Sequence, residues 1–194
     1  MNESEWTDKS RTAGYYLVMY CSPTLASIKT ASLFRFSYST DVELNEFIRE
    51  WSGQLLPKGV YLSILKKGQK EALIYVYRAR NLFEDLHKPG VQDFLKGCGY
   101  QKGSVVEAIG QLALHLAQRD DFPHEIGLFL GYPLEDVLGF IENKGKHSKY
   151  SGCWKVYHNE HEAIRIFEKF KRCKDAYVRL YFAGTTVMQL TVAV

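Results

Sequence analysis

Residues 59–78, GVYLSILKKGQKEALIYVYR, decide the fold expected for this chain. Two runs rich in β-branched and aromatic side chains, 59–67 and 71–78, are separated by the polar connection Gly-Gln-Lys at 68–70. Runs of this kind joined by a few turn residues predict an antiparallel hairpin. We expect this hairpin to be the nucleus of a mostly antiparallel sheet.

Helical patterns fill much of the rest of the chain. Residues 41–51, DVELNEFIREW, place their apolar side chains near one helical face and carry acidic residues early, which is typical of a helix start. Residues 104–118 open with a Ser-x-x-Glu capping box before an apolar face. Residues 79–95 predict helix with a break at Pro89-Gly90, and residues 160–172 predict a further helix.

Proline and glycine mark two more helices in the central part of the chain. Pro123 and Pro133 each stand where a first helical turn tolerates proline. Gly131 and Gly145 stand where helix ends favour glycine. Residues 153–157 then predict a short strand.

The ends of the chain complete the expected architecture. A short helix is predicted to end near Tyr20, a Cys-Ser-Pro loop to follow, and residues 32–36 to be extended. Residues 185–194 predict a final strand, and residues 1–12 a disordered tail. Because neither a repeat nor a linker is evident, we expect a single α+β domain over 1–194, a mostly antiparallel sheet flanked by helices.

Composition excludes several classes of function. The 194 residues are 46% hydrophobic and 14% aromatic, enough for a sizeable core. The balance of 25 basic and 22 acidic side chains argues against a protein that binds polyanions through its overall charge. The sequence contains no phosphate loop, dinucleotide fingerprint, metal-ligand spacing or nucleophile elbow.

The cysteines and the N-terminal residues bear on location. Cys21, Cys98, Cys153 and Cys173 form no Cys-x-x-Cys pair, which favours reduced thiols. The first fourteen residues are polar and acidic, unlike a secretory signal, and there is no apolar run long enough to span a bilayer. We expect a soluble protein of the cytoplasm.

Four runs carry a resemblance to a known family. They are CSPTLASIKTASLF at 21–34, LIYVYR at 73–78, FPHEIGLFLGYPLEDVLGFI at 122–141 and GCWKVY at 152–157. These runs resemble a bacterial family catalogued as domain of unknown function 3793. The resemblance extends over nearly the whole chain and implies a bacterial cytoplasmic setting, typical of anaerobes. It implies no catalytic residue.

The pair His124-Glu125 at an expected helix start is the candidate for proton transfer. Unpaired backbone amides and the positive end of the dipole would attract an anion or favour a neutral imidazole there. His124 would act as general base or ligand anchor. The structural alternative is that His124 packs at the helix start while Glu125 complements the dipole.

Lys29, Arg78 and Lys155 are the candidate cations. Each stands beside apolar or aromatic residues in an expected strand or strand edge, an unusual place for a charge. Converging with His124, they would form a pocket for a carboxylate or phosphate. The alternative is that each extends from a sheet edge to solvent, where a basic residue discourages edge-to-edge pairing.

Aromatic residues suggest the wall of such a pocket. The chain has 13 tyrosines, 11 phenylalanines and 3 tryptophans, and we include Trp154 and Tyr132 among the ligand-binding candidates. Aromatic walls with a few fixed cations would suit a planar acidic ligand such as a flavin, tetrapyrrole or nucleobase. No motif identifies a cofactor.

The cysteines and histidines near residue 153 raise the question of a metal. The spacing His147-x5-Cys153-x4-His158-x2-His161 matches no established site, so no metal site is predicted. In a strand, Cys153 would be a buried thiol. Cys21, before Ser22-Pro23, would be a reactive thiol if its loop were exposed.

The run IGLFLGYPLEDVLGFI, residues 126–141, imitates a helix-turn-helix. However, the would-be recognition helix begins Leu134-Glu135-Asp136 and later carries Glu142, and these carboxylates would repel DNA phosphates. We interpret this unit as a structural helical hairpin and do not expect nucleic-acid binding.

Two functions therefore compete. The first is a protein or enzyme that binds a small anionic ligand through Lys29, Arg78 and Lys155, with His124 and Glu125 available for proton transfer. The second is an accessory or adaptor protein that uses an exposed aromatic face for a protein partner and does no chemistry. The sequence indicates neither a reaction nor an oligomeric state.

Overall fold

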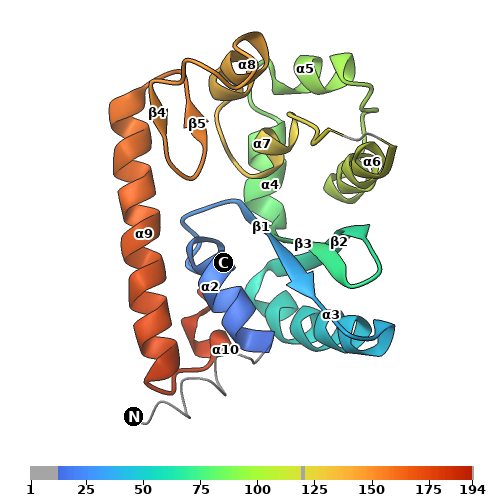
Figure 1. Ribbon diagram of the computed structural model, residues 1–194, viewed down its shortest axis with the longest axis vertical. Helices are drawn as coiled ribbons and strands as arrows, with labels where there is room; N and C mark the ends of the chain where they lie inside the picture. Colours follow the sequence, from blue (N-terminus) through green and yellow to red (C-terminus); the bar gives the residue numbers. More distant parts are fainter. Residues whose placement is uncertain (1–12, 119–120, 194) are drawn as a thin grey trace. The chain divides into compact units, whose positions relative to one another are not determined.

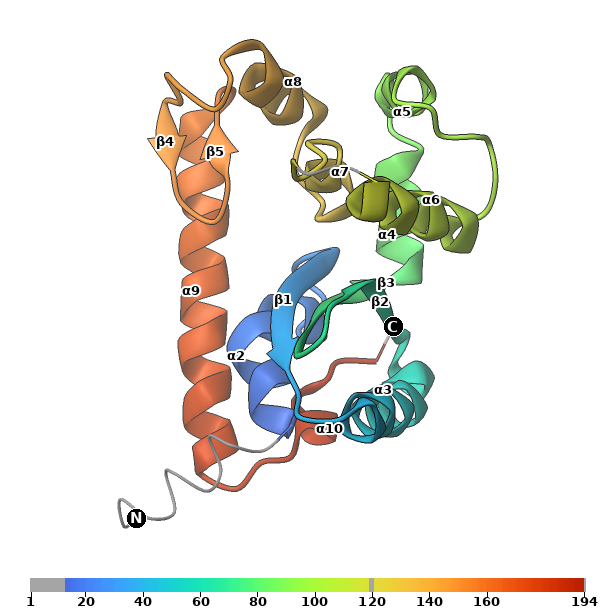
Figure 2. The same cartoon turned by 45° about the vertical axis from the view of Figure 1, so that its right-hand side comes forward.

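The computed structural model describes residues 13–118 and 121–193 (Figures 1 and 2). The chain groups into two compact units, which we call unit 1 (residues 1–78 and 170–194) and unit 2 (residues 79–169). The tail predicted at 1–12 lies outside the described residues.

The sheet of unit 1 is antiparallel and three-stranded. It consists of β1 (Ala31–Ser37), β2 (Val60–Lys67) and β3 (Glu71–Arg78) in the order β1-β3-β2. Phe34 of β1 and Ile64 of β2 both pair with Ile74 of β3, and the register shifts between Ile64 and Lys66. The predicted hairpin is confirmed, as is the α+β class with a small antiparallel sheet flanked by helices.

Helices of unit 1 bury one face of this sheet. Helix α2 (Ala13–Leu25) packs against β1, and α3 (Asp41–Leu55) packs against β2 and continues into the 3-10 turn η1 (Leu56–Lys58). Alternate strand residues face the helices, because successive side chains of a strand point to opposite faces. The shared core includes Leu17, Val18, Phe34, Phe36, Leu44, Phe47, Ile74, Val76 and Val187.

Unit 2 is mostly helical. It contains α4 (Ala79–Leu86), α5 (Val91–Gly97), α6 (Val105–Gln118), α7 (Ile126–Phe129), α8 (Leu134–Glu142) and the small hairpin of β4 (Tyr150–Ser151) and β5 (Lys155–Val156), followed by the first turns of α9 (Glu160–Phe182). In both views the hairpin lies beside those turns of α9 (Figures 1 and 2). Tyr150 and Phe167 meet there, with ring centroids 6.2 Å apart.

Capping explains where two of the helices begin. The amide of Glu107 donates to Ser104 Oγ at 3.3 Å while the amide of Ser104 donates to Glu107 Oε2 at 2.7 Å, so the predicted capping box of α6 is confirmed. The amide and the hydroxyl of Ser104 both donate to the Glu107 carboxylate and lower its pKa. Thr40 caps α3 in the same way, accepting from the amide of Glu43.

The N-terminal helix is longer than predicted. Helix α2 passes through Pro23 and ends at Leu25 instead of near Tyr20. Proline removes one backbone donor. The turn is closed by other bonds, because the hydroxyl of Ser22 donates to Val18 O and the amide of Ala26 donates to Ser22 O. Cys21 therefore lies in a helix and not in a loop.

Two further predictions near the C-terminus are wrong. Residues 185–194 contain the helical turn α10 (Val187–Leu190), because Thr186 and Gln189 form a capping box that the strand prediction overlooked. The strand predicted over 153–157 is restricted to Lys155–Val156, since residues 152–154 form the turn of the β4–β5 hairpin. The helix predicted over 160–172 continues to Phe182.

The grouping into two units leaves the single domain a prediction. Strand β3 ends at Arg78, and α4 begins at the next residue. Helix α9 contributes its first ten residues to unit 2 and the remainder to unit 1. A conventional linker is absent from the described residues at both crossings.

Replacing Thr186 by Ala should destabilise the protein by about 1 kcal/mol, because the first turn of α10 loses its side-chain cap. Urea unfolding followed by circular dichroism would measure the change. Thr185→Ala is the matched control, since it alters the preceding threonine and leaves the cap in place. Equal destabilisation by both substitutions would contradict a capping role for Thr186.

Candidate functional site

An aromatic cluster in unit 2 brings together four of the residues predicted from the sequence. Tyr132 stacks on Trp154 with ring centroids 4.7 Å apart and planes 13° from parallel. The centroid of Phe140 lies 5.9 Å from that of Trp154 and 5.0 Å from that of His124. Lys155 Nζ lies 5.9 Å from the Phe140 centroid. Phe140 therefore stands at the centre of the cluster, and the sequence had not marked it as a candidate.

Glycines allow this cluster to pack closely. A Cβ at Gly127 would stand 2.7 Å from atoms of Trp154 and Val137. A Cβ at Gly139 would stand 2.5 Å from Cβ and Cγ of Tyr157. Real side chains do not approach so near, so both positions require a residue without a side chain. The missing side chains at Gly127 and Gly139 thus leave room for the aromatic rings to pack against α7 and α8.

Lys155 is engaged with the backbone. Its ammonium donates to Gly145 O, at the loop that follows α8. Gly145 has a φ of 70°, in the left-handed region that glycine favours. The candidate cation therefore stabilises a turn, beside the ring of Phe140, and forms part of the scaffold of unit 2.

The two members of the pair His124-Glu125 lie in different environments. His124 is exposed, whereas Glu125 is 3% exposed and accepts from His115 Nδ1 at 2.8 Å and from the Tyr100 hydroxyl at 3.4 Å. A buried carboxylate requires such partners. His115, on the apolar face of α6, was missed because its sequence position gives no sign of Glu125 ten residues later. Helix α7 is a single turn, so little helix dipole is available to either residue.

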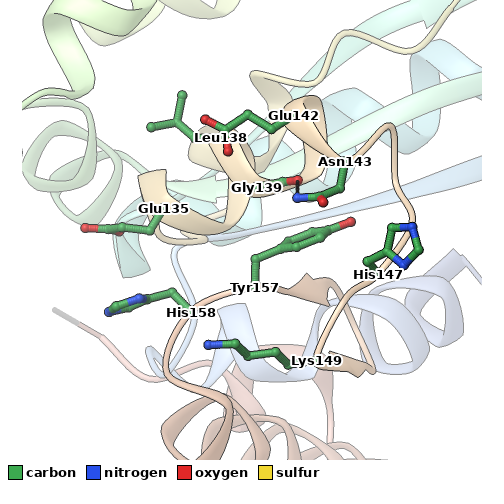
Figure 3. A pocket seen from close by; sticks show the side chains of 9 residues that line it. All are labelled: Glu135, Leu138, Gly139, Glu142, Asn143, His147, Lys149, Tyr157 and His158. Carbon is green, nitrogen blue, oxygen red and sulfur yellow. Dashed lines mark hydrogen bonds between the residues drawn. The ribbon is translucent and has the colours of Figure 1, made fainter.

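A cavity of about 460 Å³ lies in unit 2, on the side of α8 that faces the chain around the β4–β5 hairpin (Figure 3). Most of the residues that line it carry polar side chains. They are Glu135, Leu138, Gly139, Glu142, Asn143, His147, Lys149, Tyr157 and His158. Sequence reasoning noticed His147 and His158 only as metal ligands and did not place any of the nine in a binding site.

Asp136 fixes one wall of the cavity against the other. It is 4% exposed, and its Oδ1 accepts from the backbone amides of Tyr157 and His158 at 2.8 and 2.9 Å. On the α8 side, the side-chain amide of Asn143 donates to Gly139 O at 2.8 Å (Figure 3). The buried carboxylate therefore positions the lining residues Tyr157 and His158, and Asn143 is bound to its own helix.

Tyr157 combines a buried hydroxyl with a close approach to α8. Its phenol oxygen has no hydrogen-bond partner among the described residues. In Figure 3 the hydroxyl points toward the side of the cavity formed by Asn143 and His147. Burial and the nearby Asp136 carboxylate raise the pKa of this phenol, so Tyr157 is a neutral donor at physiological pH.

Arg78 in unit 1 binds four backbone carbonyls. It is 1% exposed, and its guanidinium donates to Thr24 O at 2.6 Å, Leu25 O at 2.7 Å, Val192 O at 2.8 Å and Lys58 O at 3.3 Å. Burial lowers the pKa of the guanidinium, which stays charged because arginine is so basic. Arg78 thus joins the end of α2, the turn η1 and the C-terminal segment.

Lys29, the other candidate in unit 1, lies in the loop between α2 and β1. Its Nζ is 5.9 Å from the centroid of the Phe170 ring, a cation–π distance. Lys29 and Arg78 belong to unit 1, whereas the other five candidates belong to unit 2. The convergence of all these cations in one pocket remains a prediction.

The thiols differ from their expected environments. Cys21 is fully buried in α2, and burial raises the pKa of its thiol, which is the opposite of what a reactive cysteine requires. Cys153 is exposed at the hairpin turn, so the buried thiol expected there is wrong. Within residues 13–118 and 121–193, no group of three or more His, Cys, Asp or Glu side chains is arranged to hold a metal.

Helices α7 and α8, whose sequence imitates a helix-turn-helix, pack against the aromatic cluster, and α8 also lines the cavity. Helix α7 has one turn and is buried, and α8 begins with Glu135 and Asp136. Asp136 is used internally, and Glu135 lines the cavity.

A family model described as Protein of unknown function (DUF3793) matches residues 17–191. The chain belongs to this family. The match includes the four runs that suggested the resemblance, and the description carries neither an activity nor a ligand. No curated protein and no solved structure matches the chain. In the described part of the chain, the helices lack the combination of length and apolar character needed to cross a bilayer.

Gly139→Ala should destabilise the protein by about 1–3 kcal/mol, because the added methyl group would force Tyr157 away from α8. Gly110→Ala in α6 is the matched control: its Cβ would meet nothing within 4 Å, and alanine favours helix by about 1 kcal/mol. Thermal and urea unfolding would measure both. Stabilisation by the two substitutions alike would contradict the close approach at Gly139.

Arg78→Met should lower the free energy of unfolding by about 2–4 kcal/mol, because four carbonyls lose their donor. Urea unfolding would measure the loss. Arg80→Met is the control, since the Arg80 side chain is 77% exposed and forms a surface ion pair with Glu84 at 3.1 Å. An unchanged midpoint for Arg78→Met would show that the four bonds contribute nothing.

Proposed function

We propose that this chain binds a small polar molecule in the cavity beside α8. The observation that carries the proposal is the cavity of about 460 Å³ on which polar side chains converge from α8 and from the segments that flank the β4–β5 hairpin. Ligand sites in proteins commonly have volumes of about 300–1,000 Å³ and a few polar groups that fix orientation. The volume of this cavity lies in that range, and its lining is more polar than is usual for such sites.

The rigidity of the walls supports this proposal. Tyr157 and His158 are positioned by Asp136, and Tyr157 is also pressed against the backbone of Gly139. A site whose side chains are held in advance loses less conformational entropy when a ligand binds. The unpaired phenol of Tyr157 adds a donor that a small shift of its neighbours would offer to a ligand.

The proposed site differs from the set of cations expected from the sequence. The guanidinium of Arg78 and the ammonium of Lys155 donate hydrogen bonds to backbone carbonyls. We therefore assign the cationic role to Lys149, with His147 and His158 as further donors. We also propose a bacterial cytoplasmic setting, because the four free thiols are typical of a reducing compartment.

An adaptor role is the second candidate. The adaptor role is favoured by two apolar side chains one turn apart on α8, Leu138 and Ile141, which are 36% and 38% exposed. Singly exposed apolar residues are common on protein surfaces and do not by themselves indicate a partner. Ligand binding is therefore the leading proposal.

Leu138→Trp should block the cavity, because a lining side chain becomes much larger. We expect compounds that raise the melting temperature of the natural protein to lose that effect in this variant. Leu114→Trp, at an exposed position of α6, should keep it. Differential scanning fluorimetry with pools of amino acids, organic acids, amines and nucleobases would make the comparison. Retention of the shift in Leu138→Trp would place binding elsewhere and contradict the proposal.

A further inference from the structure

Five ionisable side chains that line the cavity have no partner among the residues that the structure describes. Glu135, Glu142, His147, Lys149 and His158 make neither a side-chain hydrogen bond nor an ion pair within the described residues. All five side chains are exposed, where opposite charges gain little by pairing with one another. Because they surround one cavity, both their charges and their hydrogen-bonding capacity are available to a ligand.

The two signs of charge come from different walls. Glu135 and Glu142 belong to α8 and lie seven residues apart, on one face of the helix. Lys149 and His147 belong to the segment between α8 and β4, and His158 follows β5. In Figure 3 the side chains of Glu135, Lys149 and His158 point to one side of the cavity. The α8 wall is therefore acidic, and the facing wall is basic.

The charge balance decides which ligands fit. The lining combines two glutamates with one lysine and two histidines, so neither sign of charge dominates. A simple anion would meet the carboxylates of α8, and a simple cation would meet Lys149. A ligand that carries both charges would face a complementary group on each wall.

We infer that the cavity takes an amphoteric ligand, a small molecule with a carboxylate and an ammonium group, of the size of a free amino acid or a short peptide. The carboxylate lies toward Lys149 and the imidazoles, and the ammonium toward the glutamates of α8. This inference rests on the proposed ligand-binding function. It replaces the purely anionic ligand expected from the sequence with a ligand of two charges.

Saturation-transfer NMR on the full chain tests the inference with three pools of small molecules: neutral amino acids, dicarboxylates and diamines. We expect members of the amino-acid pool to bind at least tenfold more tightly than any dicarboxylate or diamine, with affinities then measured by calorimetry. Lys149→Met and Glu142→Gln should each weaken that binding about tenfold. Glu84→Gln on α4 and Lys88→Met just after that helix change exposed charges outside the cavity and are controls that should leave the binding unchanged.

The double variant E135Q/E142Q tests the acidic wall directly, because it removes both of its negative charges. Without the acidic wall, the preference should shift from amino acids to dicarboxylates. If a dicarboxylate binds the natural protein as tightly as any amino acid, and Leu138→Trp abolishes that binding, the amphoteric ligand is wrong while the ligand-binding cavity stands. If no member of the three pools binds, the inference is overturned. If binding occurs and survives Leu138→Trp, the inference and the proposed function fail together.

Discussion

The organisation of the candidate site depends on one buried carboxylate oxygen, Oδ1 of Asp136. A carboxylate removed from water is costly unless donors replace its hydration. Two consecutive backbone amides, those of Tyr157 and His158, supply that replacement. Because backbone amides have little freedom, the bond pair fixes the path of the chain between β5 and α9, and with it the places of two side chains that line the cavity. The absence of a Cβ at Gly139 then allows the ring of Tyr157 to lie against α8. An acidic residue in the first turn of a helix, ordinarily explained by the dipole, here has a tertiary role.

Much of the fold could be predicted from local signals. The hairpin of β2 and β3, the capped starts of α3 and α6, and the glycine-terminated helices α7 and α8 all follow patterns contained within a few residues. The errors arose where a local rule was overridden. Pro23 lies within α2 because the Ser22 hydroxyl and a later backbone bond close the turn, and Thr186 starts a helical turn in a segment whose apolar residues favoured a strand. The strand predicted over 153–157 was too long because β5 pairs only with the two residues of β4, and the turn between the two strands extends to Trp154.

The candidate site was harder to predict, for a physical reason. Several candidates that the sequence identified have structural contacts within the fold: Lys155 donates to a carbonyl, Trp154 stacks on Tyr132 and Glu125 accepts from His115. The cavity is lined instead by ordinary exposed residues of a helix and a loop, whose significance lies in what faces them. No spacing along the chain reveals that Glu142 and Lys149 share a cavity. Four candidates, His124, Tyr132, Trp154 and Lys155, do lie in one cluster around Phe140 and Trp154.

Arg78 has a consequence for the order in which the protein can be completed during synthesis. Its guanidinium holds Thr24 O and Leu25 O from the beginning of the chain and Val192 O from the end. Unit 1 is therefore discontinuous, interrupted by the whole of unit 2, whereas unit 2 is formed by one uninterrupted segment. A ribosome releases residues 79–169 before it releases residue 192. Unit 2 can thus assemble while translation continues. The guanidinium of Arg78 can bind Val192 O only after residue 192 has left the exit tunnel.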